Sequence, residues 1–80
     1  MPKIKPVCDH QEYVLARLLA CEPGKGLDKE TFDYRFTRPI AGLTRRGWVE
    51  QMGCSILMVI KITEMGRAGC QALAIQPRKE

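Results

Sequence analysis

The chain has little of what an enzyme or a metalloprotein needs. Its 80 residues include one histidine, and they show no nucleophile elbow, no phosphate-cradling glycine loop and no evident pair of catalytic carboxylates. The four cysteines form no C-x-x-C pair, and Cys8 and His10 alone lie at a ligand spacing, with no second such pair. We therefore expect no catalytic residues, no metal and no cofactor, and we expect the cysteines to be free thiols.

Long apolar runs are also missing. No apolar segment follows the lysines of residues 1–8, so the start of the chain does not read as a signal peptide. The longest apolar run, residues 56–62, is interrupted by Lys61 and is far shorter than a bilayer-spanning helix. These patterns predict a cytoplasmic protein that makes no membrane contact.

The composition is that of a small globular domain. Hydrophobic residues make up 45% of the chain and charged residues 28%, which excludes a wholly disordered chain. The net charge of +4 permits a polyanionic partner without requiring one. We expect a flexible arm over residues 1–8, a single domain over residues 9–75 and a tail over residues 76–80.

Helical signals fill the first half of the domain. Asp9 and Glu12 form a possible capping box, and Pro23 with Gly24 would end this first helix. Asp28 is a good N-cap for a second helix, which we expect to turn Phe32 and Phe36 inward. Before it, Gly26 and Leu27 are expected to form a minimal strand that pairs with the later hairpin. The apolar stripe expected on the first helix is Val14, Leu15, Leu18, Leu19 and Cys21.

A third helix is expected to start at Thr37, as its N-cap, and to end at Gly47. Ile40 and Leu43 would face the core. Gly42, in the helix interior, has two explanations that the sequence leaves open: close approach to another molecule, or packing against a neighbouring element. The outward residues are expected to be Arg38, Ala41, Gly42, Arg45 and Arg46.

Residues 48–52 and 56–62 read as a β-hairpin, followed by a helix over residues 63–75 that Thr63 caps. The second strand is apolar on both faces, which is unusual for a strand with one face in water. We expect Leu57 and Val59 to be exposed at a sheet edge, where they would contact a second copy of the chain or another protein.

The stretches at residues 43–50 and 60–67 resemble the winged helix-turn-helix family, including bacterial regulators of the MarR and PadR types. The resemblance covers most of residues 9–75. It implies an α+β fold with three helices, a hairpin wing and a C-terminal helix. It also implies a small, sequence-specific regulator of transcription, from a bacterium, phage or mobile element, that binds double-stranded DNA as a dimer.

Carried over by position, the resemblance implies that the third helix enters the major groove, because its arginines can bind guanine or phosphate. Lys61, the basic residue of the hairpin, would also lie near the DNA. The residues facing base edges would be Arg38, Ala41, Gly42 and Arg45, and those nearer phosphates would be Arg35, Thr37, Thr44 and Arg46.

The hairpin supports an alternative function. Its tip, residues 52–55, carries no cation, although a DNA-binding wing usually does. With the apolar strand that follows, this pattern favours a winged-helix module that binds protein and not DNA. Salt-dependent DNA binding separates the two hypotheses.

Overall fold

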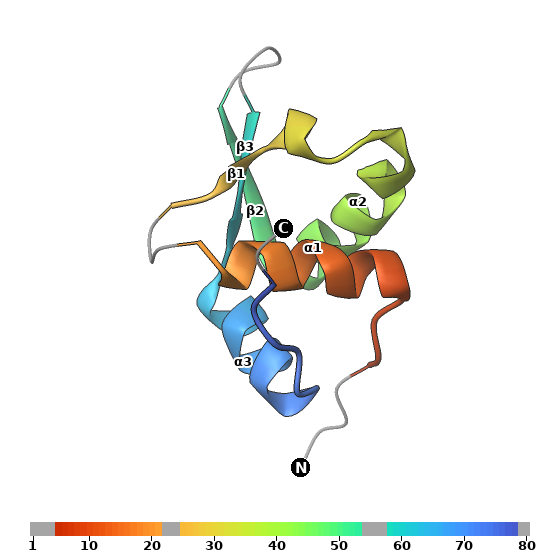
Figure 1. Cartoon of the computed structure of the whole chain (residues 1–80), viewed down its shortest axis with the longest axis vertical. Helices are drawn as coiled ribbons and strands as arrows, with labels where there is room; N and C mark the ends of the chain where they lie inside the picture. The colour runs from red at the N-terminus through yellow and green to blue at the C-terminus, as the bar shows by residue number, and fades with distance from the viewer. Residues whose placement is uncertain (1–4, 22–24, 54–57, 79–80) are drawn as a thin grey trace.

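The structure is a computed structural model, and it describes residues 5–21, 25–53 and 58–78. These residues form a small α+β domain, as expected from the sequence. They contain three α-helices, two short 3₁₀ turns and a three-stranded antiparallel sheet. Figure 1 shows α1 across the middle of the molecule, α3 below it, α2 to one side and the sheet above. In chain order the elements are α1 (Asp9–Leu19), β1 (Leu27–Asp28), η1 (Lys29–Thr31), η2 (Tyr34–Phe36), α2 (Thr37–Arg46), β2 (Val49–Gly53), β3 (Met58–Ile62) and α3 (Glu64–Ala72).

The sheet has the strand order β1-β3-β2. The hairpin expected from the sequence is confirmed over β2 and β3, and β1 confirms the minimal strand, with Leu27 opposite Ile60. Because β1 covers the far side of β3, the prediction that Val59 lies at a sheet edge is wrong. Val59 is half-buried in the middle strand, between Asp28 and Met52. Leu57 lies outside the described residues.

The core lies where α1, α2, α3 and the sheet meet. The inward face of α1 contributes Val14, Leu15 and Leu18, as the helical spacing predicted. Leu19 and Cys21, predicted for the same stripe, are half-buried. Apolar burial of this kind is the main stabilising contribution in a domain this small. The other core residues are Ala16, Phe32, Ile40, Leu43, Trp48, Val49, Ile60, Cys70 and Ile75.

The N-cap of the first helix lies one residue earlier than expected. Cys8 is the N-cap and Asp9 is the first helical residue, so the predicted capping role of Asp9 is wrong. The side chain that reaches back is that of Gln11, whose Oε1 accepts a hydrogen bond from the Cys8 N–H at 3.2 Å. Gln11 is the third helical residue counted from Cys8, which is the position a capping box requires.

The second helix, expected to start at Asp28, is absent from the described residues as an α-helix. Two 3₁₀ turns take its place, η1 and η2, with an extended Phe32 between them at φ −105° and ψ 133°. The break has a local cause, because Asp33 starts a new turn by accepting the Arg35 N–H at 2.9 Å. The inward orientation of Phe32 and Phe36 is nevertheless confirmed, since their rings lie 6.3 and 5.3 Å from the Tyr13 ring.

Because η2 runs directly into α2, the predicted N-cap at Thr37 is also wrong. Phe36 occupies the cap position with φ −93° and ψ −1°, a backbone that is already close to helical. Thr37 is therefore the first residue of the helix. The turn η2 and the helix α2 together form a nearly continuous right-handed segment from Tyr34 to Arg46.

The last helix is capped as expected and ends earlier than expected. Thr63 Oγ1 accepts a hydrogen bond from the Gly66 N–H at 3.0 Å. The helix stops at Ala72 because the chain then turns, with Ala74 at φ 58° and Ile75 donating its N–H to Cys70 O. This turn buries Ile75 and returns the chain to α1.

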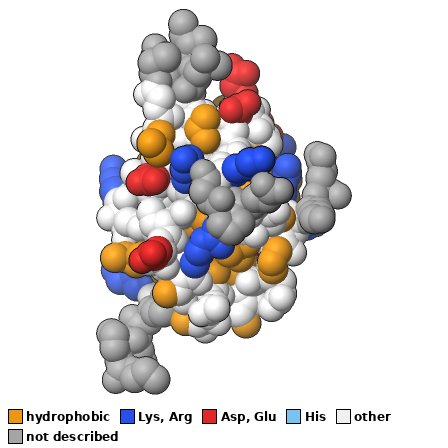
Figure 2. Space-filling view, turned by 90° about the vertical axis from the view of Figure 1, so that its left-hand side faces the viewer, with side chains coloured by type: hydrophobic (Ala, Val, Ile, Leu, Met, Phe, Trp, Pro, Cys, Tyr) orange, Lys and Arg blue, Asp and Glu red, His pale blue; other side chains and the backbone are white. Residues whose placement is uncertain are grey.

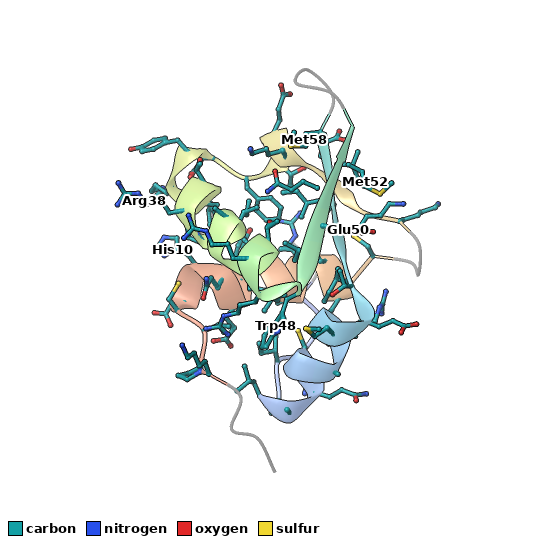
Figure 3. The ribbon with its side chains drawn as sticks, turned by 180° about the vertical axis from the view of Figure 1, so that it is seen from behind. His10, Arg38, Trp48, Glu50, Met52 and Met58 are labelled. Carbon is teal, nitrogen blue, oxygen red and sulfur yellow. The ribbon has the colours of Figure 1, made fainter. Side chains whose placement is uncertain are left out.

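Trp48 joins the hairpin to α3 (Figure 3). Its side chain is buried, and a Cβ placed on Gly69 would lie 2.5 Å from the indole ring. A Cβ on Gly66 would overlap the Trp48 carbonyl oxygen. The two glycines weaken the helix in isolation, and this close contact with Trp48 is the packing that supports it.

None of the described helices is long and apolar enough to cross a bilayer.

Candidate nucleic-acid interface

The helix α2 is fixed to the domain by its inner face. Ile40 and Leu43 are 2% and 0% exposed, as the sequence predicted. Gly47 ends the helix in a left-handed conformation, at φ 79°, and the Trp48 N–H donates to Leu43 O across the turn. The outer face of the helix is therefore held in one orientation relative to the core.

Two arginines stand on that outer face. Arg38 and Arg45 are exposed, and no hydrogen bond or ion pair with another described residue involves either one. The helix sequence from Thr37 to Arg46 contains no carboxylate that would offset their charge. Figure 3 shows Arg38 pointing away from the body of the molecule. The result is an open, positively charged side of α2.

Gly42 lies against α1. A Cβ on this residue would be 2.8 Å from Nε2 of Gln11, which donates a hydrogen bond to Pro39 O at 3.3 Å. Of the two explanations for Gly42, this geometry favours packing against a neighbouring element. Ala41 and Gly42 are both half-buried, so Arg38 and Arg45 extend furthest from the helix.

Arg46 has a different environment from the other two arginines of α2. Its Nη1 and Nη2 donate to the carbonyl oxygens of Lys5 and Pro6, both at 2.9 Å. Its guanidinium also lies over the Trp48 ring, 5.2 Å from the centroid. Residues 5 and 6 of the expected flexible arm are thus packed against the domain, and Arg46 is less available to a phosphate than Arg45.

Arg35, expected near a phosphate, is paired within its own turn. Its Nη2 lies 2.8 Å from Asp33 Oδ2, and both side chains are exposed. The hydrogen bond from Arg35 lowers the pKa of the Asp33 carboxyl and raises that of the Arg35 guanidinium. Because Asp33 offsets the charge of Arg35, this position attracts a phosphate less than Arg38 does.

The two threonines of α2 lie at opposite ends of the helix. Thr37 is exposed in the first turn. Thr44 Oγ1 donates to Ile40 O at 2.8 Å and accepts a hydrogen bond from Gln51 Nε2 at 3.0 Å. Thr44 therefore connects α2 to β2, and it is exposed, as its neighbour Arg45 is.

Lys61 lies apart from the α2 arginines. Side chains alternate along a strand, and Gln51 faces α2, so its neighbour Glu50 and the opposite residue Lys61 face the other side of the sheet. Figure 3 shows Glu50 and Met52 pointing away from α2. Lys61 is half-buried, with its stem against Gly26. The structure does not bring Lys61 together with Arg38 and Arg45.

Basic side chains are not confined to α2. Figure 2 shows Lys and Arg side chains across the middle of another face of the molecule, with apolar side chains above and below them. Any test of α2 therefore needs a charge-matched control elsewhere on the surface.

Tyr34 is a surface residue that the sequence-based site did not include. It is 86% exposed, at the start of η2 and four residues before Arg38. The sequence gives no periodic signal for it, because η2 is a 3₁₀ turn and the α-helical spacing of four does not apply across it.

The described cysteines are free thiols that differ in burial. Cys8 is exposed, whereas Cys70 is buried, and burial raises the pKa of the Cys70 thiol to about 11. Within the described ranges, no three side chains of His, Cys, Asp or Glu come together as a metal site. Cys54 lies outside those ranges.

Comparison of the chain with known proteins finds no matching family model, no matching curated protein and no matching solved structure. The open arginine side of α2 is therefore the basis for a functional proposal.

Proposed function

We propose that this protein is a small winged helix-turn-helix protein that binds double-stranded DNA, with α2 in the major groove and a role in regulating transcription. The observation that carries the proposal is the pair Arg38 and Arg45, exposed on a helix without carboxylates. The strand order β1-β3-β2 and the placement of α2 directly before the hairpin are compatible with the winged-helix fold.

The spacing of the two arginines suits a groove. Seven residues separate Arg38 from Arg45, which is about two helical turns and roughly 10 Å of axial rise. The major groove of B-form DNA is about 12 Å wide, so both guanidinium groups can lie within it at once. Each can donate two hydrogen bonds to the O6 and N7 atoms of guanine or to a phosphate.

In this proposal the two 3₁₀ turns take the place of the first helix of a helix-turn-helix and support α2. They hold Phe32 and Phe36 against Tyr13, and this aromatic cluster sets the position at which α2 begins. The phenylalanine rings also contact each other, with centroids 5.6 Å apart. A rigid support of this kind is what a recognition helix requires, because its side chains must be placed accurately against base edges.

Fluorescence anisotropy with a labelled duplex of mixed sequence tests the proposal. Because phosphate contacts release counterions, we expect binding that weakens steeply between about 50 and 200 mM salt. Arg45→Ala should weaken binding by about 1–3 kcal/mol if Arg45 contacts a base. Arg67→Ala, on α3, removes the same charge away from α2 and serves as the control. No binding by the wild-type protein at the lower salt concentration would overturn the proposal.

One observation favours a second candidate, a protein-binding surface on the outer face of the sheet. Met52 is 48% exposed and pairs across the strands with Val59. If this face joins two copies of the chain, Met52→Ser should shift the protein from dimer to monomer in sedimentation velocity. A wild-type protein that is monomeric at all concentrations would exclude self-association through this face.

A further inference from the structure

We infer that Tyr34 is a DNA-contacting residue that binds the sugar-phosphate wall of the groove entered by α2. The inference rests on the proposed function and extends it by one specific contact. Tyr34 is the most exposed of the large hydrophobic side chains that the structure describes, at 86%, ahead of Met65 at 60% and Met52 at 48%.

The backbone around Tyr34 is held firmly although its side chain is not covered. On one side, Asp33 accepts the Arg35 N–H and pairs with the Arg35 guanidinium. On the other side, Phe36 packs against the rings of His10 and Tyr13, at centroid distances of 5.1 and 5.3 Å. The Phe36 N–H donates to Asp33 O and closes the turn. The phenol is therefore presented to solvent from a fixed frame.

Tyr34 lies at the N-terminal end of the segment that carries Arg38 and Arg45. Because η2 continues directly into α2, Tyr34 lies about one turn before Arg38 and about three turns before Arg45 along one segment. All three are exposed. The segment thus carries an exposed phenol at its start and two exposed guanidinium groups along the helix.

The length of the segment from Tyr34 to Arg45 indicates what each of its ends contacts. Tyr34 lies eleven residues before Arg45, which corresponds to roughly 18 Å of rise along η2 and α2. The major groove is only about 12 Å wide, so a helix that places both arginines over base edges brings Tyr34 to the groove wall. A helix that lies along the groove also leaves it at one end, because the helix is straight and the groove winds around the duplex. At the wall, the phenol O–H can donate to a phosphate oxygen while the ring packs on deoxyribose.

The test compares Tyr34→Phe and Tyr34→Ala with the wild-type protein, with a fluorescein-labelled duplex of mixed sequence as the probe. We expect Tyr34→Ala to raise the Kd about 5- to 10-fold and Tyr34→Phe to account for most of that rise, because the lost group is a hydrogen-bond donor to a charged acceptor. Tyrosine is uncharged, so the dependence of Kd on salt should stay that of the wild type. Met65→Ala removes another exposed apolar side chain, from α3, and should leave the Kd unchanged.

Three results would contradict different parts of the account. A Tyr34→Ala protein that binds within twofold of a DNA-binding wild type would overturn this inference and leave the proposed function standing. A loss seen in Tyr34→Ala and absent from Tyr34→Phe would overturn the phosphate contact and assign the ring to stacking. If the wild type itself does not bind the duplex at about 50 mM salt, the proposed function fails and this inference fails with it. Thermal unfolding of each variant checks that the exposed substitutions leave the fold intact.

Discussion

At the scale of single residues, Gly69 shows how the packing of one side chain overrides helix propensity. Replacing a glycine inside a helix with alanine ordinarily stabilises the helix by about 1 kcal/mol. At Gly69 the added Cβ would lie 2.5 Å from two atoms of the Trp48 ring, which is itself buried against the core.

We expect Gly69→Ala to lower the free energy of unfolding by about 1–3 kcal/mol, as overpacked core sites do. Urea unfolding followed by the fluorescence of Trp48, the single tryptophan of the chain, measures this change. Gly42→Ala is the matched control, because its Cβ would meet only the flexible end of Gln11. A Gly69→Ala protein as stable as Gly42→Ala would contradict the contact between Trp48 and α3.

The Cys70 thiol gives a prediction for the dependence of stability on pH. Burial raises its pKa in the folded state to about 11, from an ordinary value of 9.0. The protonated thiol is therefore favoured by folding, and its stabilising contribution is present in full below pH 9. That contribution declines as the pH rises from 9 to 11, because the unfolded chain loses this proton first. Cys70→Ala should show a shallower loss of stability than the wild type over that interval, by urea unfolding at each pH. Parallel curves for the two proteins would contradict the burial of this thiol.

At the scale of elements, Arg46 connects the start of the chain, α2 and the hairpin. It donates to the carbonyl oxygens of Lys5 and Pro6 and covers one side of Trp48. We expect Arg46→Ala to lower the free energy of unfolding by about 1–3 kcal/mol, because two charge-assisted hydrogen bonds and one cation–π contact are lost. Arg45→Ala, one residue earlier and exposed, should change it by less than about 0.5 kcal/mol. Equal effects of the two substitutions in urea unfolding would contradict the different roles assigned to these neighbours.

The elements also show how far the sequence alone leads. The ends of α2 and α3 marked by Gly47 and Thr63 follow from local chemistry, which short-range patterns capture well. The hairpin and the inward face of α1 follow from periodicity. The segment from residue 28 to 36 was predicted as one helix and forms two 3₁₀ turns, because the Asp33 side chain starts a new turn and the aromatic cluster with Tyr13 fixes both phenylalanines. The Asp33 turn is local, whereas the aromatic contacts join residues far apart in the chain, and neither leaves a periodic signal.

The candidate site likewise combines features that the sequence predicts with contacts that only the folded structure reveals. Exposure of Arg38 and Arg45 follows from the helical wheel, since Ile40 and Leu43 must face the core. The contacts of Arg46 with Lys5 and of Gly42 with Gln11 bring together residues far apart in the sequence, so spacing within one helix could not reveal them. The same holds for Val59, whose position in the middle strand depends on the pairing of β1.

At the scale of the whole molecule, the fold turns one helix outward and uses the rest of the chain as its support. The aromatic cluster fixes the start of α2, the core fixes its inner face, and Gly47 with Trp48 fixes its end. What remains open on α2 is the side that carries Arg38 and Arg45. The surface elsewhere is also basic in part, so net charge alone does not distinguish a DNA-binding helix from a generally cationic protein.

The most direct test of the central claim is the affinity for duplex DNA of two double variants that carry the same net charge. Arg38→Ala with Arg45→Ala removes the open arginines of α2, whereas Lys29→Ala with Arg67→Ala removes two cations from η1 and α3. At about 50 mM salt, we expect the first pair to weaken binding by more than about 10-fold and the second by less than about threefold, because only the first removes contacts made within the groove. Equal losses from the two pairs would show that net charge drives the binding, and would contradict the assignment of α2 as the DNA-binding element.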